Sequence, residues 1–300
     1  MKLDFLKYKY LYFLVSGIFL IPAVLALVFW GLKPAVDFTG GSVIELRVNS
    51  NLIEEKEKVE KIIIVAGQNR EENGDKLELS SLQSSSNNSY ILKLKEISKD
   101  EKELIIKGLE AEFGEVELLK FATLGPSIGK ELIRKTVLAI ILAAGFIFFY
   151  VGYRFKDKKY GVCAILAMFH DTLILLGAFA ILGHFFKVEV DTLFVTAVLT
   201  ILSFSVHDTV VVYDRIRESI RKHPDLSFED LVNKAIGETL TRSINNSMTI
   251  IFMLLCLYLL GGETIRWFTL ALLIGTVAGT YSSTFTAAPL LVVWEKLKKK

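Results

Sequence analysis

The sequence contains few of the residues from which most metal-binding and disulfide-bonded sites are built. Its 300 residues include only 2 cysteines and 4 histidines. Cys163 and Cys256 both lie in long apolar stretches, so a disulfide framework is not indicated. The histidines lack metal-ligand spacing, and the sequence has no phosphate-binding loop and no catalytic-triad motif. We therefore expect neither an enzyme nor a bound cofactor.

Apolar residues are abundant and are gathered into long runs. They make up 52% of the chain, and the charged residues, 23%, are clustered between the runs. A membrane-spanning helix needs about 20 mostly apolar residues, and six stretches meet this condition. They are Leu11–Leu32, Leu132–Tyr153, Tyr160–Gly183, Val190–Val212, Leu240–Leu260 and Trp267–Trp294. The first lacks a small-residue cleavage site before Lys33, so we expect a retained anchor rather than a signal peptide.

Basic residues form four clusters that fall on one side of the membrane if all six stretches span it. The clusters are Lys2, Lys7 and Lys9; Arg154, Lys156, Lys158 and Lys159; Arg215, Arg217, Arg221 and Lys222; and Lys296, Lys298, Lys299 and Lys300. The positive-inside rule makes this side cytoplasmic, with both termini inside. The segment 33–131 then lies outside, and its 14 Lys/Arg against 19 Asp/Glu give a net charge of −5. The terminal lysines are more simply a topology signal than a nucleic-acid site.

The exoplasmic segment is long enough to fold as a small domain. Ser42–Val48, Lys76–Leu82, Ser89–Lys95 and Glu115–Thr123 have strand-like alternation, and Leu52–Ala66 and Ser98–Glu112 have helical periodicity. Ser98 and Glu101 are placed for a capping box, and the polar run from Ser84 to Asn88 predicts a hairpin loop. The order β-α-β-β-α-β predicts a ferredoxin-like α+β domain.

The predicted layout is a polytopic α-helical membrane protein with one large exoplasmic insertion. Residues 1–32 form the N-terminus and first helix, 33–131 the exoplasmic domain, 132–294 the other five helices, and 295–300 a basic tail. Within the bundle, Ser227 and Asp230 start an amphipathic pattern in the segment near 214–241. We expect this segment to form a short helix along the cytoplasmic surface.

Two glycine motifs flank the exoplasmic segment. Asp37, Gly40 and Gly41 follow the first apolar stretch, and Gly125, Pro126 and Gly129 precede the second. Glycine permits a tight backbone turn, so each motif is also explained by a plain turn that joins anchor to domain. Further short motifs follow in the bundle: His170-Asp171, Asp208 to Glu218, Thr241 to Ile244 and Gly261-Gly262.

Together these blocks, spread in order over most of the chain, resemble the SecD/SecF family. This family is the export-associated branch of the resistance-nodulation-division (RND) superfamily. The Asp-Arg-Ile-Arg-Glu run at 214–218 and the single moderate domain favour its SecF branch. The resemblance implies one six-helix RND-type half, with the two glycine motifs as family hinges. One departure is His207, which stands where the family usually has Asn beside the intramembrane Asp.

The resemblance also implies partners and an energy source. The expected partners are a SecD-like subunit, the SecYEG channel with SecA, and exported polypeptides; YajC and a YidC-type insertase complete the set. The implied location is the bacterial cytoplasmic (inner) membrane. The implied function is to couple inward proton flow to motion of the exoplasmic domain, with the proton gradient in place of a cofactor.

Four residues are candidates for the proton pathway. An ionisable group inside the hydrocarbon is costly and usually functional, which singles out Asp171 and Asp208. The family places the proton-carrying carboxylate at Asp208 and a functional arginine at Arg242. A contact between them that forms and breaks would exchange a proton; the alternative is a permanent structural ion pair. His207 is either a proton relay or only a hydrogen-bond donor.

Helix four carries a polar stripe that has two explanations. Side chains at helical spacing make up the stripe: Thr196, Thr200, Ser203, His207 and Asp214. Such a stripe is typical of a proton path, and it is equally typical of interhelical hydrogen bonding. Two other functions also stay open. A passive scaffold of the translocase would not need the intramembrane Asp and Arg, and an RND-type exporter of small solutes would need a second set of six helices.

Overall fold

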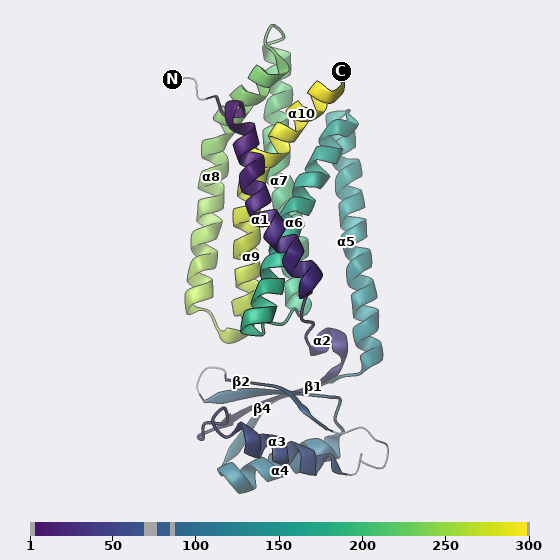
Figure 1. The fold of residues 1–300 in the computed structure, drawn as a ribbon, viewed down its shortest axis with the longest axis vertical. Coiled ribbons are helices and arrows are strands. Elements are labelled where there is room, and N and C mark those ends of the chain that lie inside the picture. The colour runs from purple at the N-terminus through teal and green to yellow at the C-terminus, as the bar shows by residue number, and fades with distance from the viewer. Residues whose placement is uncertain (1–3, 69–76, 85–87, 299–300) are drawn as a thin grey trace. The chain divides into compact units, whose positions relative to one another are not determined.

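The structure, a computed structural model, describes residues 4–68, 77–84 and 88–298. The chain divides into two compact units (Figure 1). One unit consists of residues 1–33 and 137–300, and the other of Pro34–Thr136. Each unit has its own apolar core, so each can be understood from its own sequence.

The smaller unit is a four-stranded sheet covered on one face by two helices (Figure 1). The sheet order is β2-β3-β1-β4 with all neighbours antiparallel. This is the order of a ferredoxin-like fold, which confirms the predicted class. The elements are α2 (Val36–Thr39), β1 (Gly41–Val48), α3 (Lys56–Ala66), β2 (Leu79–Ser84), β3 (Ser89–Leu94), α4 (Lys99–Phe113) and β4 (Val116–Leu124).

Local sequence explains these elements. Ile44, Leu46 and Val48 alternate along β1 and are buried in the core of the unit. Ser98 caps α4 by accepting from the Glu101 amide, and the Glu101 side chain accepts from the Ser98 amide, as the capping box predicts.

Ion pairs link the two helices of this unit. The Lys58 amine lies 3.0 Å from Glu112 of α4 and 3.2 Å from Glu55. Hydrogen bonds to Glu112 and Glu55 raise the pKa of Lys58 above its usual value. The pair therefore stays ionised near neutral pH and joins α3 to α4 at the surface.

Two predicted boundaries in this unit differ from the structure. The first helix begins at Lys56 and not at Leu52, because residues 52–55 form a turn. The second strand is Leu79–Ser84; residue 76, where it was expected to begin, lies outside the described residues. Residues 85–87 of the predicted hairpin loop also lie outside them, and the flanking β2 and β3 pair as expected.

The larger unit is a bundle of long helices. Six helices among the described residues are long and apolar enough to cross a membrane, which confirms the predicted number. Their elements are α1 (Lys9–Phe29), α5 (Pro126–Phe155), α6 (Lys158–Phe186), α7 (Thr192–Lys222), α8 (Phe228–Leu260) and α9 (Glu263–Ser282). The last continues through a π-helical turn (Ser283–Ala287) into α10 (Ala288–Lys298), and a short 3₁₀ turn (Leu6–Tyr8) precedes α1.

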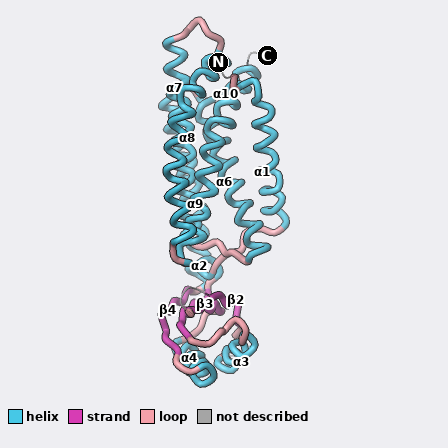
Figure 2. Tube along the Cα trace, turned by 90° about the vertical axis from the view of Figure 1, so that its left-hand side faces the viewer, coloured by secondary structure: helices cyan, strands magenta, loops and turns pink. Residues whose placement is uncertain are grey.

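Small residues bring the central helices close together. Gly275 of α9 lies against Ile201 of α7, and one turn later Gly279 lies against Ser205. Gly177 of α6 likewise lies against Ala23 of α1. A Cβ at Gly275 or Gly177 would collide with the neighbouring helix, which is the usual reason for small residues at membrane-helix contacts. A Cβ at Gly279 would lie 3.4 Å from Ser205, an ordinary van der Waals contact. Figure 2 shows the long helices of this unit lying side by side.

The prediction of a short surface helix is wrong. The segment near 214–241 belongs to two long helices, because α7 runs to Lys222 and α8 starts at Phe228. Ser227 caps α8 through the Asp230 amide as predicted. The apolar stripe, however, faces the bundle: Val232, Ala235 and Ile236 are buried in its core. Packing of this face keeps the helix continuous with the spanning part.

The first residue of β1, a glycine, provides a test of the smaller unit. Gly41 has φ +143°, and a Cβ there would lie 2.6 Å from the Leu94 carbonyl oxygen. We expect Gly41→Ala to destabilise this unit by about 1–3 kcal/mol, because the backbone conformation disfavours a side chain. Limited proteolysis of the full chain in detergent measures this. Gly145→Ala, in open space on α5, is the control, and equal protease resistance of the two variants would contradict the expectation.

Candidate functional site in the membrane bundle

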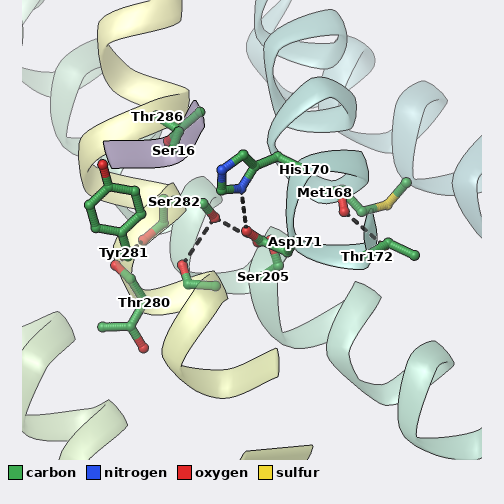
Figure 3. A network of polar contacts seen from close by, with 12 residues as sticks. Ser16, Met168, His170, Asp171, Thr172, Ser205, Thr280, Tyr281, Ser282 and Thr286 are labelled. Carbon is green, nitrogen blue, oxygen red and sulfur yellow. Dashed lines mark hydrogen bonds and ion pairs between the residues drawn. The ribbon is translucent and has the colours of Figure 1, made fainter. Parts of the chain in front are cut away.

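A buried carboxylate in the middle of α6 ties three membrane helices together. Asp171 lies about 20 Å along the helix from Lys158, at about 1.5 Å per residue, and its side chain is 1% exposed. Its Oδ2 accepts hydrogen bonds of 2.6 Å from Ser205 of α7 and of 2.6 Å from Ser282 of α9. Its Oδ1 lies 3.0 Å from His170 Nδ1. Figure 3 shows these groups converging on the carboxylate. We call these four residues the Asp171 cluster.

The cluster occupies a polar layer between two apolar cores. Met168, one turn before Asp171, belongs to one core, and Leu175, one turn after it, belongs to the other. The close contact at Gly279 brings Ser205 and Ser282 to the same carboxylate. Transferring an unbonded carboxylate out of water is very costly, so these donors are what allow Asp171 to stay buried.

Two polar atoms near this layer have no hydrogen-bond partner among the described residues. They are His170 Nε2 and Thr284 Oγ1, and both are buried. Thr284 lies in the π-helical turn that follows Ser282. Turns of this kind are rare and are found frequently at functional sites.

The second buried carboxylate, Asp208, has a simpler environment. It is 3% exposed on α7 and accepts a 2.6 Å hydrogen bond from Ser243 of α8. Thr209, the next residue on the same helix, donates to the Ser205 carbonyl one turn earlier. Asp208 is therefore held by one neutral hydroxyl, whereas Asp171 is held by three donors.

Arg242 and Asp208 form no ion pair among the described residues. Arg242 precedes Ser243, and consecutive helix residues point about 100° apart. With Ser243 facing Asp208, the Arg242 side chain is exposed and lines a cavity of about 600 Å³. The proposed Asp208–Arg242 contact stays a prediction, and a permanent ion pair is not what the structure shows.

The charged residues of the Asp-Arg-Ile-Arg-Glu run line the same cavity and form ion pairs with neighbouring helices. Asp214 lies 3.3 Å from Arg154 of α5 and 3.0 Å from Arg217. Arg215 pairs with Glu218 and with Glu238 of α8. These ion pairs link α5, α7 and α8 beside the cavity.

The predicted polar stripe of α7 lies on a face that this chain leaves uncovered. Thr196, Thr200, Ser203 and His207 are all exposed, whereas Asp214, the last member of the stripe, is half-buried and pairs with arginines. Thr196 and Thr200 donate to carbonyls of their own helix. On α8 the exposed polar residues include Arg242, Asn245, Asn246 and Thr249. Neither interhelical bonding within this chain nor a closed proton path explains the stripe.

The two glycine motifs meet in the smaller unit. Gly40 and Gly41 have φ +77° and +143°, values that favour glycine. They follow α2, whose first turn contains Asp37. A Cβ at Gly129, in the first turn of α5, would collide with the Phe38 carbonyl oxygen. The glycines therefore serve a close backbone approach.

The second motif also starts a helix. Pro126 is the first residue of α5, a position where its fixed φ and missing amide are no disadvantage. Gly125, immediately before it, lies beside the Glu96 carboxylate. Both motifs thus serve turns and close backbone contacts at the two ends of the smaller unit, and their role as hinges stays a prediction.

Sequence reasoning missed the hydroxyls that hold the carboxylates. Single serines are common in membrane helices, so nothing in the sequence distinguishes Ser205, Ser243 and Ser282 from other serines. Ser282 could have been suspected from its place three residues after Gly279, because the Gly275/Gly279 pair has the Gly-x-x-x-Gly spacing that permits close helix contact. Among the described residues, no group of three or more His, Cys, Asp or Glu side chains could hold a metal ion.

Comparison with known proteins gives matches along the whole chain. Residues 105–297 match the family described as "Protein export membrane protein SecD/SecF, C-terminal", and residues 26–51 match the "SecD/SecF GG Motif". The protein translocase subunit SecF of Thermobaculum terrenum is 41% identical over 98% of this chain and 94% of the relative. That of Anaerolinea thermophila is 37% identical over 98% and 94%.

A solved structure supports the same relationship. The crystal structure of SecDF, a translocon-associated membrane protein from Thermus thermophilus, superposes with a TM-score of 0.81 at 30% sequence identity. The match covers 99% of this chain and 39% of that chain. This chain therefore corresponds to less than half of the SecDF polypeptide.

Ser205 tests the Asp171 cluster. We expect Ser205→Ala to lower the free energy of unfolding by about 1.5–3 kcal/mol, the usual contribution of a hydrogen bond to a charged group. Thermal unfolding of the purified protein in detergent measures the loss. Ser203→Ala, on the uncovered face of the same helix, is the matched control, and we expect it to melt like the unmodified protein. If both variants melt alike, Ser205 does not stabilise the buried carboxylate.

Proposed function

Because the chain belongs to the SecD/SecF family of protein-export membrane proteins, we propose that it is a SecF-type translocase subunit that couples proton flow to polypeptide export. It is a multi-pass membrane protein with six spanning helices. In the proposal it acts as a subunit and not as an enzyme, and the proton gradient serves in place of a cofactor.

The observation that carries the proposal is the environment of Asp208. A carboxylate in a membrane helix is costly and usually functional. This one is held by a single neutral hydroxyl, that of Ser243, so it can gain or lose a proton without breaking an ion pair. The cavity lined by Arg242 and Val211 comes within one helical turn of Asp208 on α7, and in the proposal it admits water to the carboxylate.

Arg242 is the proposed switch. A guanidinium close to a carboxylate favours its ionised form, whereas burial favours the neutral form. A long arginine side chain can bend along its helix, so Arg242 can leave the cavity and approach Asp208. Each approach would release a proton, and each withdrawal would take one up. His207, exposed beside Asp208, stays a candidate relay or donor.

The uncovered polar face of α7 and α8 supports a partner subunit. Threonine, serine, histidine and asparagine side chains in a bilayer are normally covered by protein or line a water-filled space. We propose that a SecD-like subunit covers this face and completes a pair of six-helix halves. The pair would then assist the SecYEG channel and SecA, with YajC and a YidC-type insertase as further associates.

The energy available matches the proposed task. Each proton that crosses the membrane contributes about 2.3 kcal/mol per 100 mV. In the proposal, protons enter from the exoplasmic side and leave to the cytoplasm of a bacterium, where both termini lie. The domain motion they drive would pull polypeptides outward. A passive scaffold is the competing function, and it requires no titrating carboxylate.

The proposed orientation has a direct test. On a background in which Cys163 and Cys256 are replaced by alanine, we expect Lys99→Cys to react with an impermeant maleimide in intact cells. Lys298→Cys should react only after the membrane is opened. Both side chains are exposed in the structure, so access depends on the side of the membrane. The reverse pattern would invert the orientation and the direction of proton flow.

Asp208→Asn tests the proton carrier. Asparagine keeps the shape and can still accept from Ser243, but it cannot titrate. We expect proton-dependent export into vesicles to fall to the level measured without a proton gradient, with normal expression and assembly. Asp225→Asn, which removes an exposed carboxylate between α7 and α8, should export normally. Full export by Asp208→Asn would favour the scaffold. Arg242→Ala should also fail, since a charged partner is lost.

A further inference from the structure

We propose that Asp171 and His170 form a proton-operated latch that holds the π-helical turn of the last membrane segment against α1. The latch deepens the proposed function, on which its biological use rests. The latch would link proton binding to a movement of α1, the helix that leads into the smaller unit.

The latch begins at Ser282, the last residue of α9. Its hydroxyl donates a 2.6 Å hydrogen bond to the Asp171 carboxylate. The π-helical turn Ser283–Ala287 follows directly. Because a π-helical turn has weaker internal bonding than an α-helix, its position depends on contacts with neighbouring helices. Asp171 supplies one such contact at the entry of the turn.

The other contacts of this turn are to α1 and α7. Ser16 of α1 lies 3.3 Å from the Thr286 hydroxyl, and both residues are buried. Next to Ser282, the Tyr281 hydroxyl donates a 2.7 Å bond to the Tyr12 carbonyl of α1. The Tyr12 and Phe285 rings are 4.7 Å apart. A shift of Ser282 therefore acts directly on α1 (Figure 3).

A single proton changes the balance at Ser282. The ionised carboxylate is a strong acceptor, and hydrogen bonds to charged groups are about twice as strong as neutral ones. When a proton binds Asp171, the carboxylate becomes a neutral acid and this advantage is lost. Ser282 has a second acceptor within its own helix, the Gly279 carbonyl at 3.3 Å. Protonation thus favours transfer of the Ser282 hydroxyl from α6 to its own backbone.

Among the ionisable side chains around Asp171, His170 is the one placed to exchange a proton with it. The α9–α10 segment between Trp267 and Trp294 and the part of α1 beyond Lys9 contain no charged residue. The tyrosines at the turn are engaged: Tyr281 bonds to Tyr12, and Tyr213 of α7 bonds to the Ala287 carbonyl. Asp208 of α7 is bonded to Ser243 of α8. Of the described ionisable side chains, His170 is the one that contacts the carboxylate.

His170 also provides a place for the proton. Its Nδ1 lies 3.0 Å from Asp171, while its buried Nε2 has no described partner. A neutral histidine has one nitrogen that donates and one that accepts. With Nδ1–H directed at Asp171, Nε2 is a free acceptor. In the latch a proton enters at Nε2 while the Nδ1 proton passes to the carboxylate, so that Asp171 becomes the neutral acid and His170 stays neutral.

Cross-linking of the turn to α1 tests the latch without any export assay. On the Cys163→Ala, Cys256→Ala background, Ser16→Cys with Thr286→Cys places two sulfurs where hydroxyls lie 3.3 Å apart. We expect rapid disulfide formation with copper phenanthroline in detergent. Adding Asp171→Asn, which mimics the protonated state, should slow it about tenfold, the factor for loss of one charge-assisted hydrogen bond.

Three controls separate the latch from general loosening. Asp208→Asn on the same background should leave the rate unchanged, because Asp208 does not contact the turn; an equal slowing would overturn the latch. Ser282→Ala should slow the reaction, and Ser282→Thr, which keeps the hydroxyl, should restore it. If Asp171→Asn does not assemble, this serine pair decides the question. An unchanged rate in Asp171→Asn or Ser282→Ala would refute the latch while leaving the export test of Asp208 untouched.

Discussion

The bundle depends on how a carboxylate is kept in an apolar interior. Asp171 can stay buried because two hydroxyls and an imidazole from its surroundings reach it, and each donor comes with the helix that carries it. Because burying the carboxylate without these donors would be very costly, the three helices that supply them must keep their positions relative to one another. The close α7–α9 contact at Gly275 and Gly279 serves the same end, since it is what brings the hydroxyls within reach.

The two buried carboxylates differ in a way that suits different tasks. Asp171 is surrounded by donors and lies between two apolar cores, so its state affects helix packing. Asp208 has one hydroxyl partner and lies within one turn of a charged cavity, and in the proposed function it exchanges protons with water. A transport cycle needs both kinds of group, one that meets the proton and one that turns its arrival into movement. The proposed function and the proposed latch divide these tasks between Asp208 and Asp171.

Part of the polar face of α7 is uncovered in this chain, and the proposed function assigns its cover to a partner subunit. Its span helices α6 and α7 are half buried, while α1, α5 and α8 are largely exposed. Apolar exposed faces suit lipid, but the polar residues from Thr196 to His207 do not. A second half of related architecture would cover them, and the correspondence of this chain to 39% of the SecDF polypeptide is consistent with such an arrangement.

The sequence by itself determined the number of spanning helices, the α+β class of the inserted domain, the succession of its strands and helices along the chain and the capping of its second helix, because hydropathy and periodicity are local properties of the chain. It also identified Asp171 and Asp208, since a lone charge in an apolar run is conspicuous. Only the tertiary structure decided that Ser282, Ser205 and Ser243 hold these carboxylates, and that the polar stripe of α7 faces outward. It also merged the expected surface helix into α8. Which hydroxyl reaches which carboxylate depends on helix rotation and close packing, and neither is recorded in the local pattern of any one helix.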